Sequence, residues 1–265
     1  MDEEVAFFNK NGYILIPDAL TESECEELKN MIDTLDNKTK GDKKKQSRHQ
    51  MHKVVFIQYP ELCLRIFKNK RIHSLCKKII GMCGSPRGSS DTSLKMHVIH
   101  NNTYCVQPGQ RGQAPVWHTD DPPLFITTNE KNLPDNIIFA PTVLTCMYYL
   151  NDIRGPIDGM THVIPGSHRF GRLCTKDDAE SQNFIAPAVK KGTALIISSS
   201  VWHRGSNVAP EGRPRYVFQV SYGRRLVGHK HDTIMDFVMP NQVKNLLKTD
   251  EDKELMGYLQ GGAYS

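Results

Sequence analysis

From Leu94 onward the chain breaks into short apolar segments, and this pattern constrains the fold more than any other feature of the sequence. The segments are rich in Val, Ile, Thr and Tyr, and clusters of Gly, Pro, Asn and Asp separate them. Short runs of β-branched and aromatic residues bounded by turn formers are typical of strands in a β-sandwich or barrel. We expect such strands over residues 96–99, 142–150, 162–164, 193–198 and 216–222.

Helical patterns flank these strands on both sides. Thr21 and Glu24 have the spacing of a capping box, and apolar residues then recur at helical intervals, which predicts a helix over 21–35. The strand-like segment 13–17 precedes this helix. Further helices are expected over 60–67 and 71–80, with Gly81 as the C-cap, and in the tail from about residue 236.

The length of 265 residues suits one large domain with a β core and helical additions. We therefore predict a single domain, mainly β with flanking helices, over residues 1–265. Its helical N-terminal part covers about 18–82, its β core about 94–225 and its helical tail about 235–258.

Several classes of protein do not fit the composition. No apolar run is long enough to cross a bilayer, and the first residues lack the order of a signal peptide, so we expect a cytoplasmic protein. The seven cysteines form no C-x-x-C pair, which argues against a disulfide framework and a thiolate zinc site. The sequence leaves the choice between monomer and homodimer open.

Part of the net charge of +5 comes from a basic cluster between Lys38 and Arg48. A run of like charges is usually a solvated loop, and an anion-recruiting patch is the alternative. The cluster lacks interleaved aromatic residues, and no zinc-finger or RNA-binding pattern occurs in the chain, so nucleic acid is not an expected partner.

The chemistry-bearing residues begin with Val116-Trp-His-Thr-Asp-Asp-Pro-Pro123. In an extended segment, His118 and Asp120 point to the same face, where an imidazole nitrogen and a carboxylate oxygen can meet one metal ion. A second histidine, His203, follows the strand-like run 193–198. Two histidines and one carboxylate form the facial triad that leaves positions open on Fe(II).

An arginine follows the distal histidine at the head of the next strand, where a guanidinium can bind a carboxylate through two hydrogen bonds. Arg213 and Arg215 are both candidates for this role. Arg215 fits better, because it directly precedes the strand and shares a face with Val217 and Gln219, whereas Pro214 separates Arg213 from that strand.

In this order of motifs the chain resembles the phytanoyl-CoA dioxygenase (PhyH) family of iron(II)- and 2-oxoglutarate-dependent oxygenases. The most characteristic segment is Val163-Ile-Pro-Gly-Ser-His-Arg169, between the first and second histidine motifs. One departure is the sequence His203-Arg-Gly-Ser206, since relatives often have His-Gly-Ser at this point. The other matching segments are residues 8–17, 117–120, 147–152, 158–169 and 202–203, followed by Arg215.

The resemblance implies a double-stranded β-helix, the jelly-roll or cupin-like core, and a mononuclear iron centre. His118, Asp120 and His203 would bind Fe(II), and Arg215 would hold the distal carboxylate of 2-oxoglutarate. Gln107, Thr161 and Ser206 are weaker candidates for contacts with the co-substrate, as are Met96 and Tyr104 for the pocket. We expect His168 to be part of a structural turn and not a metal ligand.

By the same resemblance, the protein would use O2 to hydroxylate an unactivated carbon of a small organic molecule, with release of succinate and CO2. A carboxylate at the third ligand position leaves no room for a halide on iron, so hydroxylation or another oxidation is favoured over halogenation. The alternatives are desaturation, cyclisation or epimerisation at the same iron centre, or a catalytically silent scaffold that acts as a binding protein. The substrate candidates are the basic residues Arg48, His49 and His52, near Gln46 and Gln50, and they suggest an anionic substrate.

Overall fold

The computed structural model describes most of the chain, and the statements below concern this part. The described residues are 2–38, 51–81, 96–112, 114–127, 134, 137–138, 140–180, 182–230 and 238–258.

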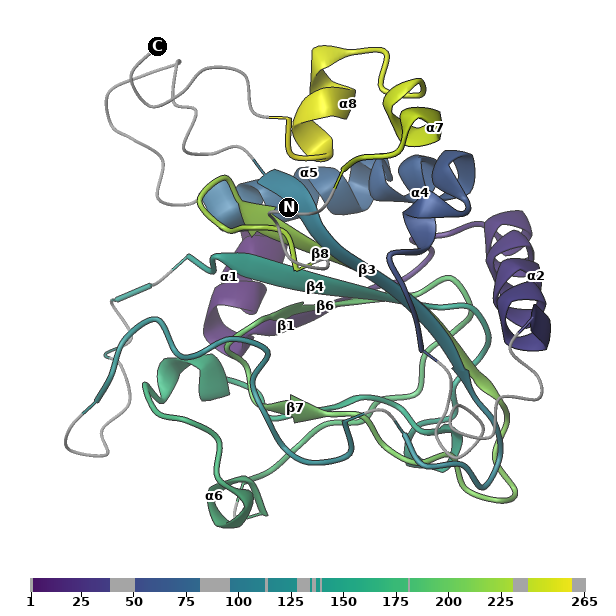
Figure 1. The fold of residues 1–265 in the computed structure, drawn as a ribbon. Coiled ribbons are helices and arrows are strands. Elements are labelled where there is room, and N and C mark those ends of the chain that lie inside the picture. Colours follow the sequence, from purple (N-terminus) through teal and green to yellow (C-terminus); the bar gives the residue numbers. More distant parts are fainter. Residues whose placement is uncertain are drawn as a thin grey trace.

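One antiparallel six-stranded sheet dominates the structure (Figure 1), and its strand order is β1-β6-β4-β8-β3-β2. The order differs from the sequence order because the chain crosses repeatedly between this sheet and the opposite side of the molecule. The strands are β1 (Tyr13–Ile16), β2 (Met51–Lys53), β3 (Met96–Val106), β4 (Val143–Tyr149), β6 (Ala194–Ser198) and β8 (Arg215–Arg224).

A much smaller sheet lies on the other side of the core. It consists of β5 (His162–Val163) and β7 (His203–Arg204), which pair in antiparallel fashion. Isolated bridges extend it, from His118 to His203 and from Val163 to Ile185. The two sheets together enclose the inner core.

The side chains of the large sheet alternate between two faces, as they must in a strand. Tyr104, Met147, Tyr149 and Val217 point toward the small sheet and join one apolar cluster with Val163. We call this side the inner face. The intervening residues point to the outer face and pack in a second cluster with the helices, for example Cys146, Tyr148, Phe218, Val220 and Tyr222.

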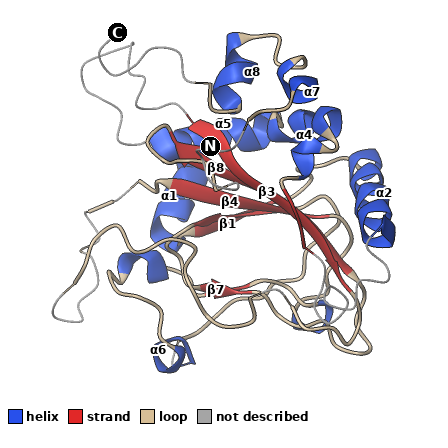
Figure 2. Ribbon diagram, viewed as in Figure 1, coloured by secondary structure: helices blue, strands red, loops and turns tan. Residues whose placement is uncertain are grey.

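Helices cover the outer face of the large sheet, and loops with the small sheet lie opposite (Figure 2). The apolar stripe of α5 (Lys70–Ile80), made by Ile72, Leu75, Cys76 and Ile79, is buried there. The helices are α1 (Asp2–Asn11), α2 (Glu22–Lys38), α4 (Pro60–Phe67), α5 (Lys70–Ile80), α6 (Lys176–Glu180), α7 (Asn241–Lys244) and α8 (Asp250–Leu255), and the 3-10 turns are η1 (Val55–Ile57), η4 (Pro156–Asp158) and η5 (Ser167–Arg169).

Most elements expected from the sequence are present. The capping box before α2 forms in both directions, since the Thr21 amide donates to Glu24 Oε2 at 2.8 Å and the Glu24 amide donates to Thr21 Oγ1 at 3.2 Å. Gly81 is the C-cap of α5, although its φ of −82° is one that any residue can adopt. Helix α1 and strands β2 and β7 were not expected, and β3 extends well beyond the predicted segment 96–99.

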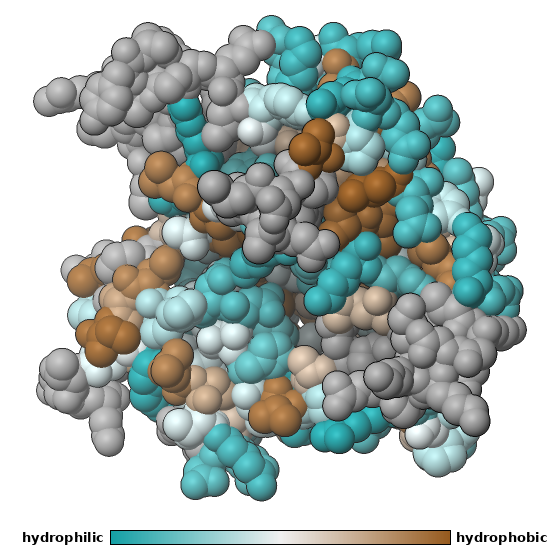
Figure 3. All heavy atoms as spheres, in the orientation of Figure 1, coloured by the Kyte–Doolittle hydropathy of each residue, from teal (hydrophilic) through white to brown (hydrophobic). Residues whose placement is uncertain are grey.

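The visible surface alternates hydrophilic and apolar residues (Figure 3). Four of the exposed large apolar side chains, Leu124, Ile126, Ile137 and Ile138, belong to the stretch that follows the His118-x-Asp120 motif. No helix within the described residues is long and apolar enough to cross a membrane.

Candidate metal centre and its surroundings

Two histidines from distant parts of the chain meet across a single β-bridge. The His118 amide donates to the His203 carbonyl at 3.0 Å, and the His203 amide donates to the His118 carbonyl at 3.0 Å. Because directly opposed residues of a bridge share a face, both rings point the same way, with their centroids 4.4 Å apart. The fold therefore brings the two predicted histidines together on the inside of the small sheet.

One nitrogen of each imidazole forms a hydrogen bond with a backbone carbonyl. His118 Nδ1 lies 2.8 Å from the Val116 carbonyl, and His203 Nδ1 lies 3.0 Å from the Val201 carbonyl. A carbonyl can only accept, so each Nδ1 carries the proton and each Nε2 keeps its lone pair. Such a hydrogen bond sets the tautomer and ring orientation of metal-binding histidines. Both Nε2 atoms are thus prepared as ligands.

Asp120 supplies the third ligand atom. Its Oδ1 lies 3.9 Å from His118 Nε2 and 3.7 Å from His203 Nε2. The ligand atoms of the three residues all lie within 4.8 Å of one another, so one ion can contact them all. The other carboxylate oxygen, Oδ2, accepts a hydrogen bond of 3.2 Å from the hydroxyl of Thr145 on β4. This contact orients Oδ1 toward the two rings.

The electrostatics favour a neutral histidine at this point. Burial lowers the pKa of His203, and the nearby carboxylate of Asp120 opposes the shift only in part. Metal binding requires the deprotonated ring, so the lowered pKa of His203 suits a ligand. Nitrogen and carboxylate donors in a two-to-one ratio match the preferences of Fe(II) in mononuclear oxygenases.

A cavity opens beside the three residues, with about 420 Å³ of space including its open side. Its wall on the large sheet comes from inward-facing positions of neighbouring strands, namely Tyr104 on β3, Thr145 and Met147 on β4, and Gln219 on β8. Strand alternation on the predicted strands could have indicated Thr145 and Gln219, which were not singled out from the sequence. The remaining lining residues are Ala114, His118, Asp120, Thr161, His203 and Gly205.

Arg215 begins β8 and faces the interior. Its side chain is only 1% exposed, and its Nε and Nη1 atoms have no hydrogen-bond partner within the described part of the chain. The guanidinium carbon lies 5.9 Å from the centre of the Tyr104 ring, and Tyr104 is part of the cavity wall. Burial raises the pKa of Tyr104 to about 12, and Arg215 opposes that shift. A buried guanidinium with unpaired N–H groups is suited to accept an anionic ligand.

Arg213 is placed quite differently. Its side chain is exposed, and its backbone amide donates to Asp158 Oδ1 at 2.7 Å. The geometry thus agrees with the sequence argument that favoured Arg215, in which Pro214 keeps Arg213 off the strand.

The other predicted co-substrate residues occupy mixed positions. Thr161 is buried in the cavity wall, and its hydroxyl accepts a hydrogen bond of 2.8 Å from Tyr149. Ser206 and Gln107 do not line this cavity. The Ser206 hydroxyl donates to the Met160 carbonyl at 2.6 Å, and the exposed side chain of Gln107 donates to Cys105 Sγ at 3.2 Å.

The predicted substrate residues lie away from this cavity or outside the described part. Arg48 and His49 are not among the described residues. His52 on β2 lies opposite Thr103, whereas its neighbour Met51 lies opposite the inward-facing Tyr104. His52 therefore points to the outer face, where its Nε2 lies 2.6 Å from Asp36 Oδ1 of α2. The side chain of His52 therefore points away from the inner face, where the candidate metal ligands lie.

Arg204, the residue that departs from the usual His-Gly-Ser pattern, extends the small strand β7. It pairs with His162 on β5, and its Nε donates to His162 Nδ1 at 3.1 Å. Its guanidinium lies over the rings of Trp117 at 4.6 Å and Phe184 at 5.7 Å. The side chain thus lies on the side opposite to His203, and it packs the sheet without entering the cavity.

His168 and its turn have the predicted structural role. Gly166 has a φ of +78°, which favours glycine, and it begins the 3-10 turn η5. His168 Nε2 lies 3.0 Å from the carbonyl of Asn9. The turn therefore fastens helix α1 to the core, and His168 is not part of the metal-binding set.

Two facing antiparallel sheets with a two-histidine, one-carboxylate site between them define the cupin-like class of metal-dependent oxygenase folds. The sequence matches the family model described as "Phytanoyl-CoA dioxygenase (PhyH)" over residues 8–215. The chain belongs to this family. The mainly β, double-stranded β-helix fold expected from the sequence is thereby confirmed.

Three solved structures share this fold at low sequence identity. HygX from Streptomyces hygroscopicus, solved with nickel and 2-oxoglutarate, aligns with a TM-score of 0.63 at 15% identity over 86% of this chain and 89% of its own. SnoK, a non-heme α-ketoglutarate-dependent carbocyclase from nogalamycin biosynthesis, has a TM-score of 0.64 at 18% identity over 91% of both chains.

EctD from S. alaskensis, solved with 2-oxoglutarate and 5-hydroxyectoine, has a TM-score of 0.60 at 20% identity over 84% of this chain and 76% of its own. No curated protein matches the sequence significantly. Membership in the family and the site geometry support an iron- and 2-oxoglutarate-dependent oxygenase activity in general.

Proposed function

We propose that the protein is an Fe(II)- and 2-oxoglutarate-dependent dioxygenase that hydroxylates an unactivated carbon of a small organic molecule. One observation carries the proposal. Three ligands with the donor set of an Fe(II) site line a cavity, and the wall of this cavity contacts a buried arginine without an acceptor.

The residues fit both groups that the reaction needs. His118, Asp120 and His203 would hold Fe(II) through two Nε2 atoms and Oδ1, because the remaining polar atoms of these side chains have other partners. Arg215 would hold the distal carboxylate of 2-oxoglutarate through its planar guanidinium, in which Nε and Nη1 have no hydrogen-bond partner among the described residues. The bound groups together supply dioxygen activation coupled to the conversion of 2-oxoglutarate into succinate and CO2.

The protein contributes positioning and exclusion of water. Thr145 fixes the Asp120 carboxylate, and the β-bridge fixes the backbone of both histidines. Met147 and Thr161 line the cavity beside the metal ligands. The open side of the cavity leaves access for a substrate carbon next to the metal, and a dry, ordered site limits turnover without substrate.

Desaturation, cyclisation and epimerisation remain alternative outcomes at the same centre. The similar structures include a carbocyclase and an epimerase, SnoN, so this fold accommodates more than one reaction. Retention of three metal ligands and the buried arginine argues against a silent scaffold, whose signature would be the loss of a ligand.

Turnover with labelled dioxygen tests the proposal. A panel of small organic acids, phosphates and neutral compounds is incubated with protein, Fe(II) and 2-oxoglutarate, and succinate is measured. We expect succinate release stimulated by a substrate, with one labelled oxygen atom in the product, and loss of both in His203→Ala. His162→Ala is the matched control, because His162 lies on the opposite side of the same small sheet. Equal succinate release by His203→Ala would contradict the proposal, and an unlabelled, dehydrogenated or isomeric product would contradict hydroxylation.

A further inference from the structure

A second group of polar side chains lies on the inner face, four and more residues along β3 from the partner of Arg215. Lys53 on β2 lies opposite Asn102 on β3, and Asn102 lies opposite Gln219 on β8. Directly paired residues point to the same face, and Gln219 lines the cavity. Lys53 and Asn102 therefore face the same side as the cavity wall.

Two polar atoms of this group are buried without a partner. Asn102 is only 3% exposed, and its Oδ1 has no hydrogen bond. His100, two residues earlier on the same face, likewise has a buried and unpaired Nδ1. Buried polar atoms are nearly always paired in folded proteins, so unpaired ones on the face of the sheet that carries the cavity wall point to a ligand. An amide can present either its oxygen or its NH2 group to such a ligand.

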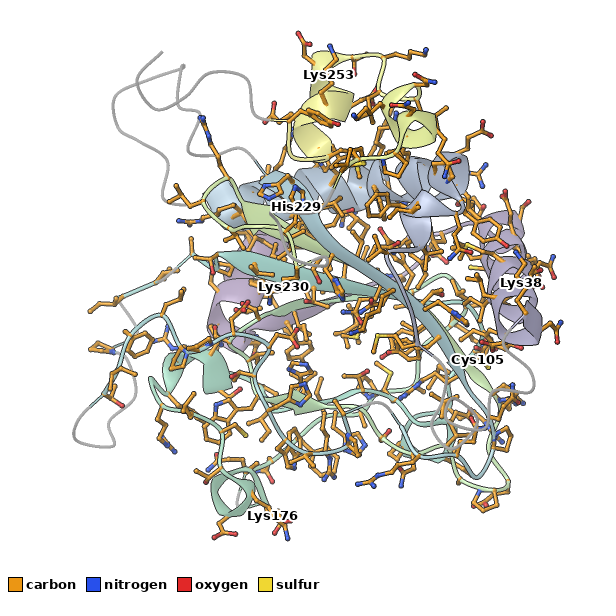
Figure 4. The ribbon with its side chains drawn as sticks, in the orientation of Figure 1. Lys38, Cys105, Lys176, His229, Lys230 and Lys253 are labelled. Atoms are coloured by element: carbon orange, nitrogen blue, oxygen red, sulfur yellow. The ribbon has the colours of Figure 1, made fainter. Side chains whose placement is uncertain are left out.

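The charge around this group is positive. Burial lowers the pKa of His100, the ammonium groups of Lys53 and Lys230 lower it further, and the carboxylate of Asp120 opposes these shifts. Lys230, in the segment that follows β8 (Figure 4), is neutralised by Asp121, with Nζ 2.7 Å from Oδ1. Lys53 forms no ion pair with any residue that the structure describes.

The neighbouring carboxylates do not cancel this charge. Asp120 faces the two histidine ligands, where a metal cation would neutralise it. Asp121 is paired with Lys230 through Oδ1, while its Oδ2 is buried without a hydrogen-bond partner in the described part of the chain. Among the described residues, Lys53 is thus a cation without a counter-ion, and two side chains near it each have one unpaired polar atom.

We propose that Lys53, His100 and Asn102 form a subsite that binds an anionic group of the organic substrate, either a carboxylate or a phosphate. The inference rests on the proposed function and specifies its substrate class. Lys53 pairs with the anion, while Asn102 and His100 donate hydrogen bonds to it. The Lys230–Asp121 pair forms part of the rim.

This subsite is distinct from the one proposed for 2-oxoglutarate. Asn102 lies four residues along β3 from Val106, the strand partner of Arg215. At the usual rise of a strand this separation is about 13 Å. The two cationic groups are thus separated by about this distance along the strand direction, so one five-carbon diacid does not occupy both.

Paramagnetic relaxation tests the subsite without turnover. The protein is loaded with Mn(II) and saturating 2-oxoglutarate, and the probes are methylphosphonate, followed by phosphorus resonance, and labelled acetate, followed by carbon resonance. We expect one of the probes to bind close to the metal and relax rapidly, and the tighter probe identifies the anion. Lys53→Ala should weaken its binding by about tenfold or more, because a charge-assisted contact is lost. Lys53→Arg should retain most of the binding.

Lys244→Ala is the matched control, since it removes the same charge from the exposed surface of α7. Unchanged binding of the probe by Lys53→Ala would overturn the inference. It would also be overturned if the metal relaxed neither probe, or if the addition of 2-oxoglutarate abolished the relaxation of the probe. Failure to bind Mn(II), seen directly in the spin-resonance spectrum of the metal, would instead contradict the proposed function, and the subsite would fall with it.

Discussion

Replacing Arg215 by methionine removes a buried cation that has no acceptor among the described residues. The side chain is 1% exposed, and both Nε and Nη1 lack a hydrogen-bond partner. A buried donor without a partner costs about 1–3 kcal/mol, and more when it is charged. Methionine is of similar length and adapts to irregular space. We therefore expect Arg215→Met to increase the free energy of unfolding of the metal-free protein by about 1–3 kcal/mol.

The same change should remove the response to 2-oxoglutarate. A ligand that binds only the folded state at one hundred times its dissociation constant stabilises a protein by about 2.7 kcal/mol. In the presence of Mn(II), wild type should gain about this amount when 2-oxoglutarate is added at that excess, and Arg215→Met should gain almost nothing. Urea denaturation followed by circular dichroism, with and without the ligands, measures both effects.

Arg213→Met is the matched control for this experiment. Arg213 is exposed, and its contact with Asp158 uses the backbone amide, which the substitution leaves in place. Its free energy of unfolding should change by less than about 0.5 kcal/mol, with the full response to 2-oxoglutarate. A destabilised Arg215→Met that keeps the wild-type response would refute the reasoning.

Three further substitutions test particular contacts. Thr145→Val removes the hydrogen bond to Asp120 at nearly constant side-chain volume. Metal affinity, measured by Mn(II) spin resonance, should therefore fall about 10- to 100-fold. Unchanged affinity would show that this hydrogen bond is not needed for metal binding. Asp158→Asn should reduce the free energy of unfolding by about 2 kcal/mol at neutral pH, because this buried carboxylate accepts bonds from the Arg154 side chain and from backbone amides. Hydrogen bonding to Arg154 is the largest cause that lowers the pKa of Asp158. The stabilisation by this carboxylate is therefore present above the ordinary pKa of aspartate and is lost as the pH falls through the lowered pKa. Urea curves for wild type and Asp158→Asn should converge only in strong acid, and a stability difference that grows with acidity would contradict this expectation. Thr21→Ala breaks the capping box of α2 and should cost about 1 kcal/mol in thermal unfolding, whereas no change would mean that the cap adds nothing to stability.

The candidate metal ligands and Arg215 could be singled out from local sequence because each depends on a simple pattern. A histidine and an aspartate two residues apart share a face, and Arg215 has strand parity with Val217 and Gln219. Pro214 also explained the exposure of Arg213. The match of residues 8–215 to the family model accounts for the fold class that the order of motifs had predicted.

The features that the sequence did not show depend on long-range pairing. Strand β2 has only three residues, Met51–Lys53, and no periodicity, so its position beside β3 and the inward direction of Lys53 could not be inferred. The same pairing turns His52 outward to Asp36, away from the role in substrate binding predicted from its basic character. Thr145 lay on a predicted strand, but its contact with Asp120 joins residues 25 positions apart.

The most direct test of the central claim is an anaerobic titration of the metal-free protein with Fe(II) and then 2-oxoglutarate, followed by visible charge-transfer absorbance. We expect a band in wild type that requires both additions and is absent from His118→Ala, because only an Fe(II) ion held by the protein and chelated by 2-oxoglutarate gives this transition. A folded wild-type protein that shows no band, or a His118→Ala variant that shows the same band, would contradict the assignment of His118, Asp120 and His203 as the iron site.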